Sequence, residues 1–116
     1  MALIWALSSI GGRDLSVHLP VSDKVVHCAE YAVLGFLLAH AALSTWPRHS
    51  IVRAAALALL ITVAWGVLDE VHQAFVPGRD ADVFDLVADV LGGLIGTSLR
   101  AAVRRFRAAS RTASTP

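Results

Sequence analysis

Three long apolar runs constrain this chain more than any other feature. They cover residues 25–45, 51–76 and 82–102. A helix crosses a hydrocarbon core of about 30 Å in about 20 residues, and each run is that long. Only 16% of the residues are charged, against about 25% in an ordinary soluble domain. We therefore expect an all-α, polytopic transmembrane helical bundle with three full spans.

Local signals indicate where these helices begin and end. Ser22 or Asp23 can cap the first run, and Pro77 stops the second. Asp82 is a favourable N-cap for the third run, and Asp85 then occupies its third helical position. An acid suits that place because the N-terminal end of a helix is positively polarised.

The two ends of the chain differ from the three runs. Residues 1–10 are apolar, but ten residues of helix rise only about 15 Å, half a bilayer. We expect a short, truncated N-terminal span there. Residues 107–116 are basic and polar, which predicts a disordered cytoplasmic tail after a single transmembrane domain at 1–106. The lone cysteine, Cys28, excludes an internal disulfide.

Small residues recur along one face of the third run. Ala88, Gly92 and Gly96 follow a four-residue spacing, with Gly93 beside them. Such a stripe lets another helix approach closely in lipid. A phosphate-binding glycine loop is excluded because these glycines lie inside the expected helix. The stripe predicts helix packing, with a homo-oligomer through it as one form.

Basic residues gather at one side of the membrane. Seven of the ten are Arg48, Arg53, Arg100, Arg104, Arg105, Arg107 and Arg111. The positive-inside rule places the turn at 46–50 and the C-terminus in the cytoplasm. The loop at 11–24 and the turn at 77–82 then face outward. All nine acids lie in that outer half or its loops.

Several acids fall at a common depth. Counting 1.5 Å of rise per residue puts Glu30, Asp69 and Asp89 about 10 Å below the outer helix ends. A shallower tier holds His27, Gln73 and Asp85. Close carboxylates in a poor dielectric need protons, a cation or a basic partner. We therefore expect a metal site from Glu30, Asp69, Glu70 and Asp89, with a divalent cation as the possible cofactor. Helix caps and structural ion pairs remain the alternative.

Spaced motifs resemble the VanZ-like family. They read Asp23-Lys24-x-x-His27-x-x-x-Tyr31, then Asp69-Glu70-x-x-Gln73-x-Phe75-x-Pro77-Gly78-Arg79, then Asp85 and Gly92. The resemblance spans residues 22–97 and implies a small bacterial envelope protein; the namesake of the family is associated with resistance to the glycopeptide teicoplanin. Many members have Asn where this chain has Asp89, which adds a carboxylate here.

Three functions remain open on this basis. The first is a binder of a glycopeptide or a lipid-linked envelope ligand in an outward acidic pocket, where Arg79 would contact phosphate or carboxylate. The ligand-binding candidates are Asp23, Lys24, His27, Tyr31, Asp69, Glu70, Gln73, Arg79, Asp85 and Asp89. The second is an intramembrane hydrolase or transferase in which Asp69, Glu70 and Asp89 with His27 bind Mg²⁺ or Zn²⁺. The hard oxygen ligands favour Mg²⁺, and a carboxylate or His72 would act as general base. An ion-coupled transporter ranks last, and the basic tail lacks the aromatics that nucleic-acid binding favours.

Overall fold

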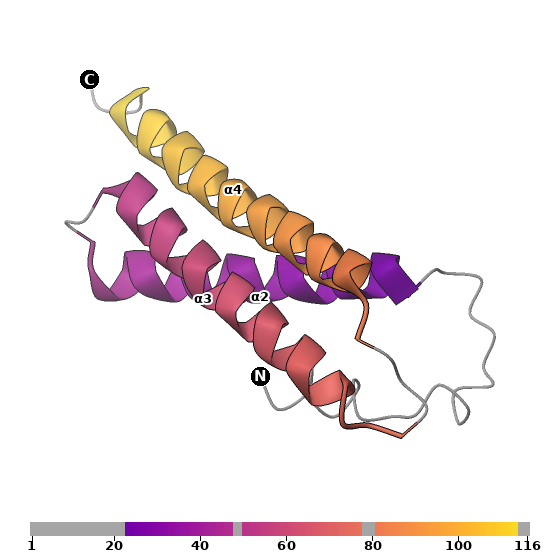
Figure 1. The fold of residues 1–116 in the computed structure, drawn as a ribbon. Helices are drawn as coiled ribbons and strands as arrows, with labels where there is room; N and C mark the ends of the chain where they lie inside the picture. The colour runs from indigo at the N-terminus through magenta and orange to yellow at the C-terminus, as the bar shows by residue number, and fades with distance from the viewer. Residues whose placement is uncertain (1–22, 48–49, 78–80, 114–116) are drawn as a thin grey trace.

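Three helices make up the part of the chain that the computed structural model describes, which is residues 23–47, 50–77 and 81–113. They are α2 (Asp23–Thr45), α3 (Ile51–Gln73) and α4 (Val83–Ala113) (Figure 1). Each is long and apolar enough to cross a membrane. The predicted all-α bundle with three spans is confirmed. The expected short helix at residues 1–10 lies outside the described residues.

Hydrogen bonds at the helix ends agree with the expected caps. The backbone N–H of Phe84 donates to Oδ1 of Asp82 at 2.8 Å, so Asp82 is the N-cap of α4. The side chain of Ser50 accepts from the N–H of Val52 in the same way at the start of α3. Asp85 occupies the third position of α4, as its sequence position predicts.

Two helix ends differ from the prediction. Helix α3 ends at Gln73 and not at Val76, because the N–H groups of Phe75 and Val76 bond three residues back in tight turns. The residue before a proline is disfavoured in the helical region, so the chain leaves the helix before Pro77. Helix α4 continues to Ala113, past the predicted end near residue 102. Alanine and arginine are strong helix formers, which allows the basic segment to stay helical.

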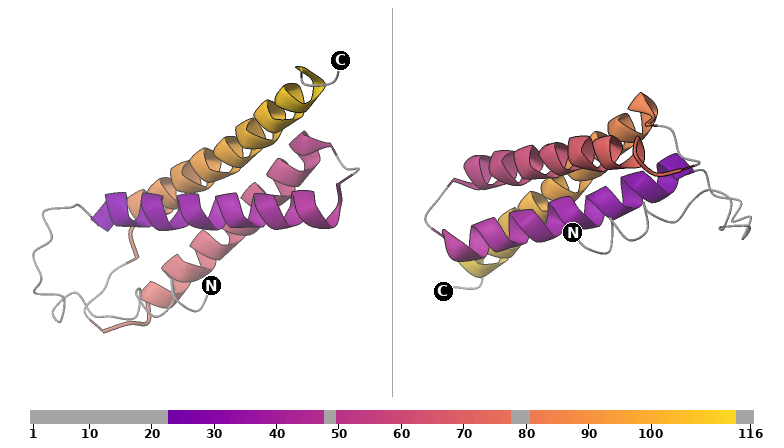
Figure 2. Two further views of the ribbon diagram at one scale, coloured as in Figure 1. Left: turned by 180° about the vertical axis from the view of Figure 1, so that it is seen from behind. Right: turned by 60° about the horizontal axis from the view of Figure 1, so that its bottom comes forward.

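Helices α2 and α4 run in the same direction, and α3, which connects them in the chain, runs in the opposite direction (Figure 1). The two further views show α4 lying along α2 and crossing it at an angle (Figure 2). Side-chain contacts give the register of this parallel pair. Lys24 meets Asp82 at one end, and His40 meets Arg100 toward the other. Residues of α2 therefore face residues of α4 about sixty positions later.

The glycine stripe is the contact surface of this pair. A Cβ atom at Gly92 would collide with the backbone of Cys28, and one at Gly96 with the backbone of Ala32. Only glycine lets the two backbones approach so closely. The predicted helix packing is confirmed, but the partner is α2 of the same chain. Because α2 contacts Gly92 and Gly96, the structure gives no support to an oligomer through this stripe, which stays a prediction.

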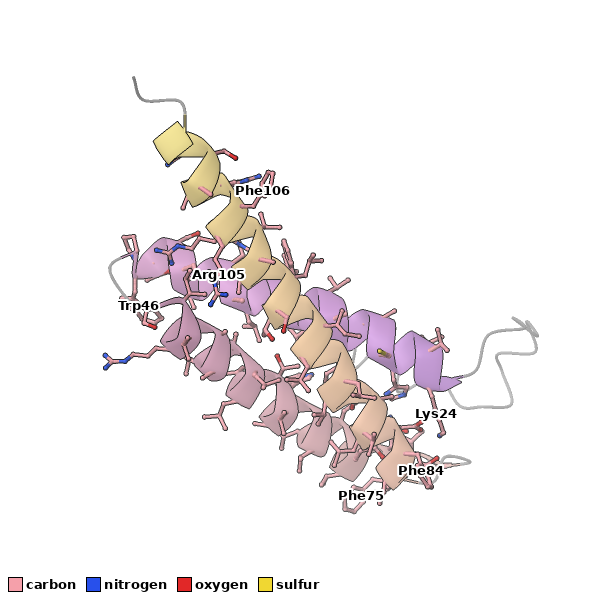
Figure 3. The ribbon with its side chains drawn as sticks, turned by 90° about the horizontal axis from the view of Figure 1, so that it is seen from above. Lys24, Trp46, Phe75, Phe84, Arg105 and Phe106 are labelled. Atoms are coloured by element: carbon pink, nitrogen blue, oxygen red, sulfur yellow. The ribbon has the colours of Figure 1, made fainter. Side chains whose placement is uncertain are left out.

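The two ends of the bundle carry different side chains. Lys24, Phe75 and Phe84 lie at one end, and Trp46, Arg105 and Phe106 lie toward the other (Figure 3). We call the first the acidic end, because Asp82 and Asp85 also lie there. Between the ends, the outward faces of all three helices are lined by exposed aliphatic side chains, as a surface in contact with lipid requires.

Candidate functional site

Lys24 organises the outermost layer of the acidic end. Its Nζ lies 2.7 Å from Oδ2 of Asp82 and 2.8 Å from Oδ1 of Asp85. It also lies 5.8 Å from the centre of the Phe84 ring, within the range of a cation–π contact. The hydrogen bonds from Lys24 and from the N–H of Phe84 hold the pKa of Asp82 below its usual value. This layer ties the start of α2 to the start of α4.

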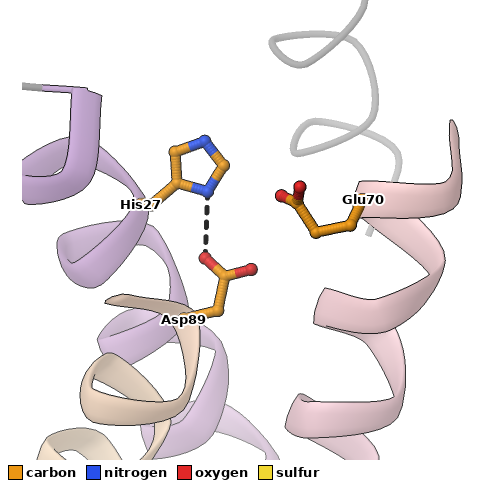
Figure 4. A group of neighbouring side chains, drawn as sticks. All are labelled: His27, Glu70 and Asp89. Atoms are coloured by element: carbon orange, nitrogen blue, oxygen red, sulfur yellow. Dashed lines mark hydrogen bonds and ion pairs between the residues drawn. The ribbon is translucent and has the colours of Figure 1, made fainter. Parts of the chain in front are cut away.

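A histidine and an aspartate form the next layer. Nδ1 of His27 on α2 lies 2.9 Å from Oδ1 of Asp89 on α4 (Figure 4). Asp89 is fully buried and His27 is 7% exposed. Gly66 on α3 makes this position possible, because a Cβ there would lie only 3.0 Å from Oδ2 of Asp89. The close approach of α3 therefore depends on Gly66, a residue that the sequence did not single out.

Glu70 brings α3 into the same layer. Its Oε2 accepts a hydrogen bond of 2.8 Å from the backbone N–H of Asp82, which fixes the carboxylate against the start of α4. The other end of that carboxylate faces His27 and Asp89 (Figure 4). One nitrogen or oxygen atom from each of these three side chains lies within 4.8 Å of the others. We call His27, Glu70 and Asp89 the inner cluster.

Two oxygens of the inner cluster have unused bonding capacity. Within the described residues, Oε1 of Glu70 and Oδ2 of Asp89 are buried and accept no hydrogen bond. Neither side chain contacts a lysine or arginine in those residues. A buried carboxylate oxygen without a partner is costly in a low dielectric. Such atoms indicate a place where a proton donor or a cation binds.

Three further polar residues surround the cluster. Tyr31 follows His27 by one helical turn, is fully buried, and its hydroxyl has no hydrogen-bond partner among the described residues. Asp69 is also fully buried, and its Oδ2 accepts from Nε2 of Gln73 at 3.3 Å. Tyr31 lies on α2 one turn beyond His27, and Asp69 lies on α3 next to Glu70. The buried polar side chains therefore continue from the inner cluster farther into the bundle.

The structure thus brings together most of the predicted residues. Glu30 is the exception in the predicted metal set: it is half-buried, and His27 takes its place beside Asp89. Counting rise along each helix did not identify the pair of His27 and Asp89, because the depth of a residue on its own helix does not say which side chain of the next helix it faces. Asp69 also falls outside the closest group. The side chain of Asp23 and all of Arg79 lie outside the described residues.

The arrangement limits what the site can do chemically. A His–Asp pair can hold a proton and orient the imidazole, and a nearby carboxylate can act as acid, base or cation ligand. The layer formed by Lys24 lies between this group and the end of the bundle. His72, the other predicted base, is half-buried on α3 and lies outside the inner cluster.

Comparison with known proteins supports the resemblance seen in the motifs. A family model described as VanZ/LLP1 matches residues 3–104. The match includes all of α2 and α3, the inner cluster and the part of α4 that packs on α2. Comparisons with curated proteins and with solved structures gave no match.

Proposed function

The chain belongs to the VanZ/LLP1 family, and from that premise we propose that it is a bacterial cell-envelope protein that binds the polar head of an amphiphilic ligand. The ligand class is a glycopeptide or a lipid-linked envelope precursor. The observation that carries this proposal is the meeting of three buried side chains, His27, Glu70 and Asp89, from three helices. Two of their carboxylate oxygens have no hydrogen-bond partner within the part of the chain that the structure describes.

Charge distribution supports an outward-facing site. The arginines of α4 from Arg100 onward lie at the end opposite Lys24, and the positive-inside rule assigns such an end to the cytoplasm. The protein is then a multi-pass protein of the cytoplasmic membrane with its C-terminus inside. In that orientation the inner cluster lies within the outer leaflet, at the level where the head group of an amphiphile meets its chain.

The test is antibiotic susceptibility in a bacterial host without a VanZ-like protein. Expression of the wild-type chain is expected to raise the inhibitory concentration of teicoplanin. Glu70→Gln removes a charge from the inner cluster without a large change in volume, and it is expected to abolish the protection. Arg79→Ala tests the predicted phosphate or carboxylate contact in the same assay.

His40→Gln is the matched control. His40 lies on α2 near the arginine end and bonds to Arg100, so its replacement should leave the protection intact. Equal susceptibility of cells expressing the wild type, Glu70→Gln and Arg79→Ala, at equal membrane abundance, would refute a role for these residues.

A second candidate function is a metal-dependent hydrolase or transferase that acts on a phospholipid or polyprenyl-linked substrate. The specific observation in its favour is the hydrogen bond between His27 and Asp89 next to Glu70, since a histidine oriented by a carboxylate is a common general base. The two candidates differ in one measurable respect. A binder returns its ligand unchanged, whereas a hydrolase or transferase releases phosphate or a transferred head group.

A further inference from the structure

The inner cluster has the composition of a metal site. It joins one imidazole and two carboxylates from three separate helices. Three protein ligands with open remaining positions are typical of sites where a metal meets an exchangeable ligand. Glu70 follows His27 by 43 residues, and Asp89 follows Glu70 by 19 residues. Such distances along the chain mean that the packing of the helices brings the three side chains together.

The distances allow one cation to contact all three side chains. Tetrahedral ligands about 2.1 Å from a zinc ion lie about 3.4 Å from one another. The ligand atoms of His27, Glu70 and Asp89 lie within 4.8 Å of one another, and Nδ1 of His27 lies 2.9 Å from Oδ1 of Asp89. These spacings therefore differ from about 3.4 Å by roughly 1.4 Å or less.

The unpaired oxygens point to the same ligand. Oε1 of Glu70 and Oδ2 of Asp89 are buried without a partner in the described part of the chain, and both side chains are at least nine-tenths buried. Oε2 of Glu70 accepts from the N–H of Asp82, and the Glu70 side chain points toward His27 and Asp89 (Figure 4). A divalent cation would satisfy both oxygens and compensate their charge.

We propose that His27, Glu70 and Asp89 bind one divalent transition-metal cation of the zinc class. An imidazole ligand is typical of zinc and other late first-row transition metals, whereas Mg²⁺ is usually bound by oxygen ligands alone. This inference rests on the proposed function, since it names a component of the same site. The open coordination positions of the cation then take the phosphate or carboxylate of the envelope ligand.

The experiment measures cation binding directly, without any envelope ligand. The full chain is purified in detergent without a polyhistidine tag, stripped with chelator and titrated with Zn²⁺ or Co²⁺. We expect one cation per chain, a Co²⁺ absorption band of a site with nitrogen and oxygen ligands, and a higher unfolding temperature with metal. The affinity for the cation should fall by about tenfold or more in each of His27→Gln, Glu70→Gln and Asp89→Asn.

Two control variants keep the test specific. His40→Gln removes an imidazole from the same helix, and Asp85→Asn removes a carboxylate that Lys24 already pairs. Both should bind the cation as the wild type does. Wild-type protein that is folded but binds neither cation would overturn the proposal, as would binding that all three cluster variants retain. Tight binding of Mg²⁺ without Co²⁺ would overturn the choice of cation.

The two proposals fail in different ways. Loss of teicoplanin protection in Glu70→Gln, together with wild-type protein that binds no metal, removes the cation and leaves the ligand site. Stoichiometric metal binding without any effect on susceptibility removes the envelope ligand and leaves the cation.

Discussion

The contact between α2 and α4 gives the sharpest prediction about stability. In Gly96→Ala, the new Cβ would collide with the carbonyl of Ala32 and would lie 2.8 Å from the backbone nitrogen of Phe36. Backbone atoms of a helix cannot rotate away as a side chain can. The two helices must therefore separate, and contacts along their whole interface weaken.

The magnitude follows from two opposing effects. Replacing glycine by alanine inside a helix stabilises the helix by about 1 kcal/mol. This difference does not change the free energy of unfolding if the unfolded state in a micelle keeps its helices, because it is then present in both states. Overpacking costs about 1–3 kcal/mol, and a clash between two backbones belongs in the upper part of that range. We expect Gly96→Ala to lower the free energy of unfolding by about 2–3 kcal/mol.

Gly66→Ala is the matched control, because it makes the same chemical change in α3. There the nearest atoms are Oδ2 of Asp89 at 3.0 Å, and Cβ of Asp89 and Cδ1 of Leu86 at 3.3 Å. These are side-chain atoms that need to give by only a few tenths of an ångström, so Gly66→Ala should cost less than Gly96→Ala. The assay is unfolding in dodecylmaltoside with rising SDS, followed by the fluorescence of Trp65, which packs against the core formed by Tyr31 and Leu34. Equal stabilities of the two variants would refute the reasoning.

Two further predictions concern charge. The pKa of Asp82 lies below its usual value because Lys24 and the N–H of Phe84 donate to its carboxylate. The ionised form therefore stabilises the fold above about pH 4, and this contribution is lost as the pH falls further. Asp82→Asn keeps a capping oxygen but no charge, so its stability difference from the wild type should shrink on acidification; a difference independent of pH would contradict this. Alkaline phosphatase inserted in the turn at 77–82 should be active and fused to the C-terminus inactive, and the reverse pattern would contradict the proposed orientation.

Much of the fold could be predicted from local patterns. The lengths of the three apolar runs predicted three spans, because the thickness of a bilayer sets the length of a crossing helix. The N-cap at Asp82 was also predictable, since it depends on residues close in the chain. The packing of a helix against Gly92 and Gly96 was predictable from their four-residue spacing. The end of α4 was not, because arginine and alanine favour a helix even in a segment that reads as a tail.

The sequence could predict which residues belong to the candidate site, but not which of their side chains contact one another. Asp89, Glu70 and His27 were all among the ligand-binding candidates that the sequence analysis named. The sequence also led to Glu30 as a metal ligand, whereas the closest group among the described residues contains His27. It led to oligomer contacts through the glycine stripe, which packs on α2 of the same chain. Both stay predictions.

The sequence by itself determined that three helices of the described residues are long and apolar enough to cross a membrane and that the acids gather toward one end, because hydrophobic length and charge are properties of single segments. Only the tertiary structure decided that His27 lies against Asp89, that Gly66 admits the Asp89 carboxylate, and that Glu70 turns toward both. The physical reason is that the packing and crossing of the helices decide which residues of different helices meet. The position of a residue along its own helix does not reveal its partner.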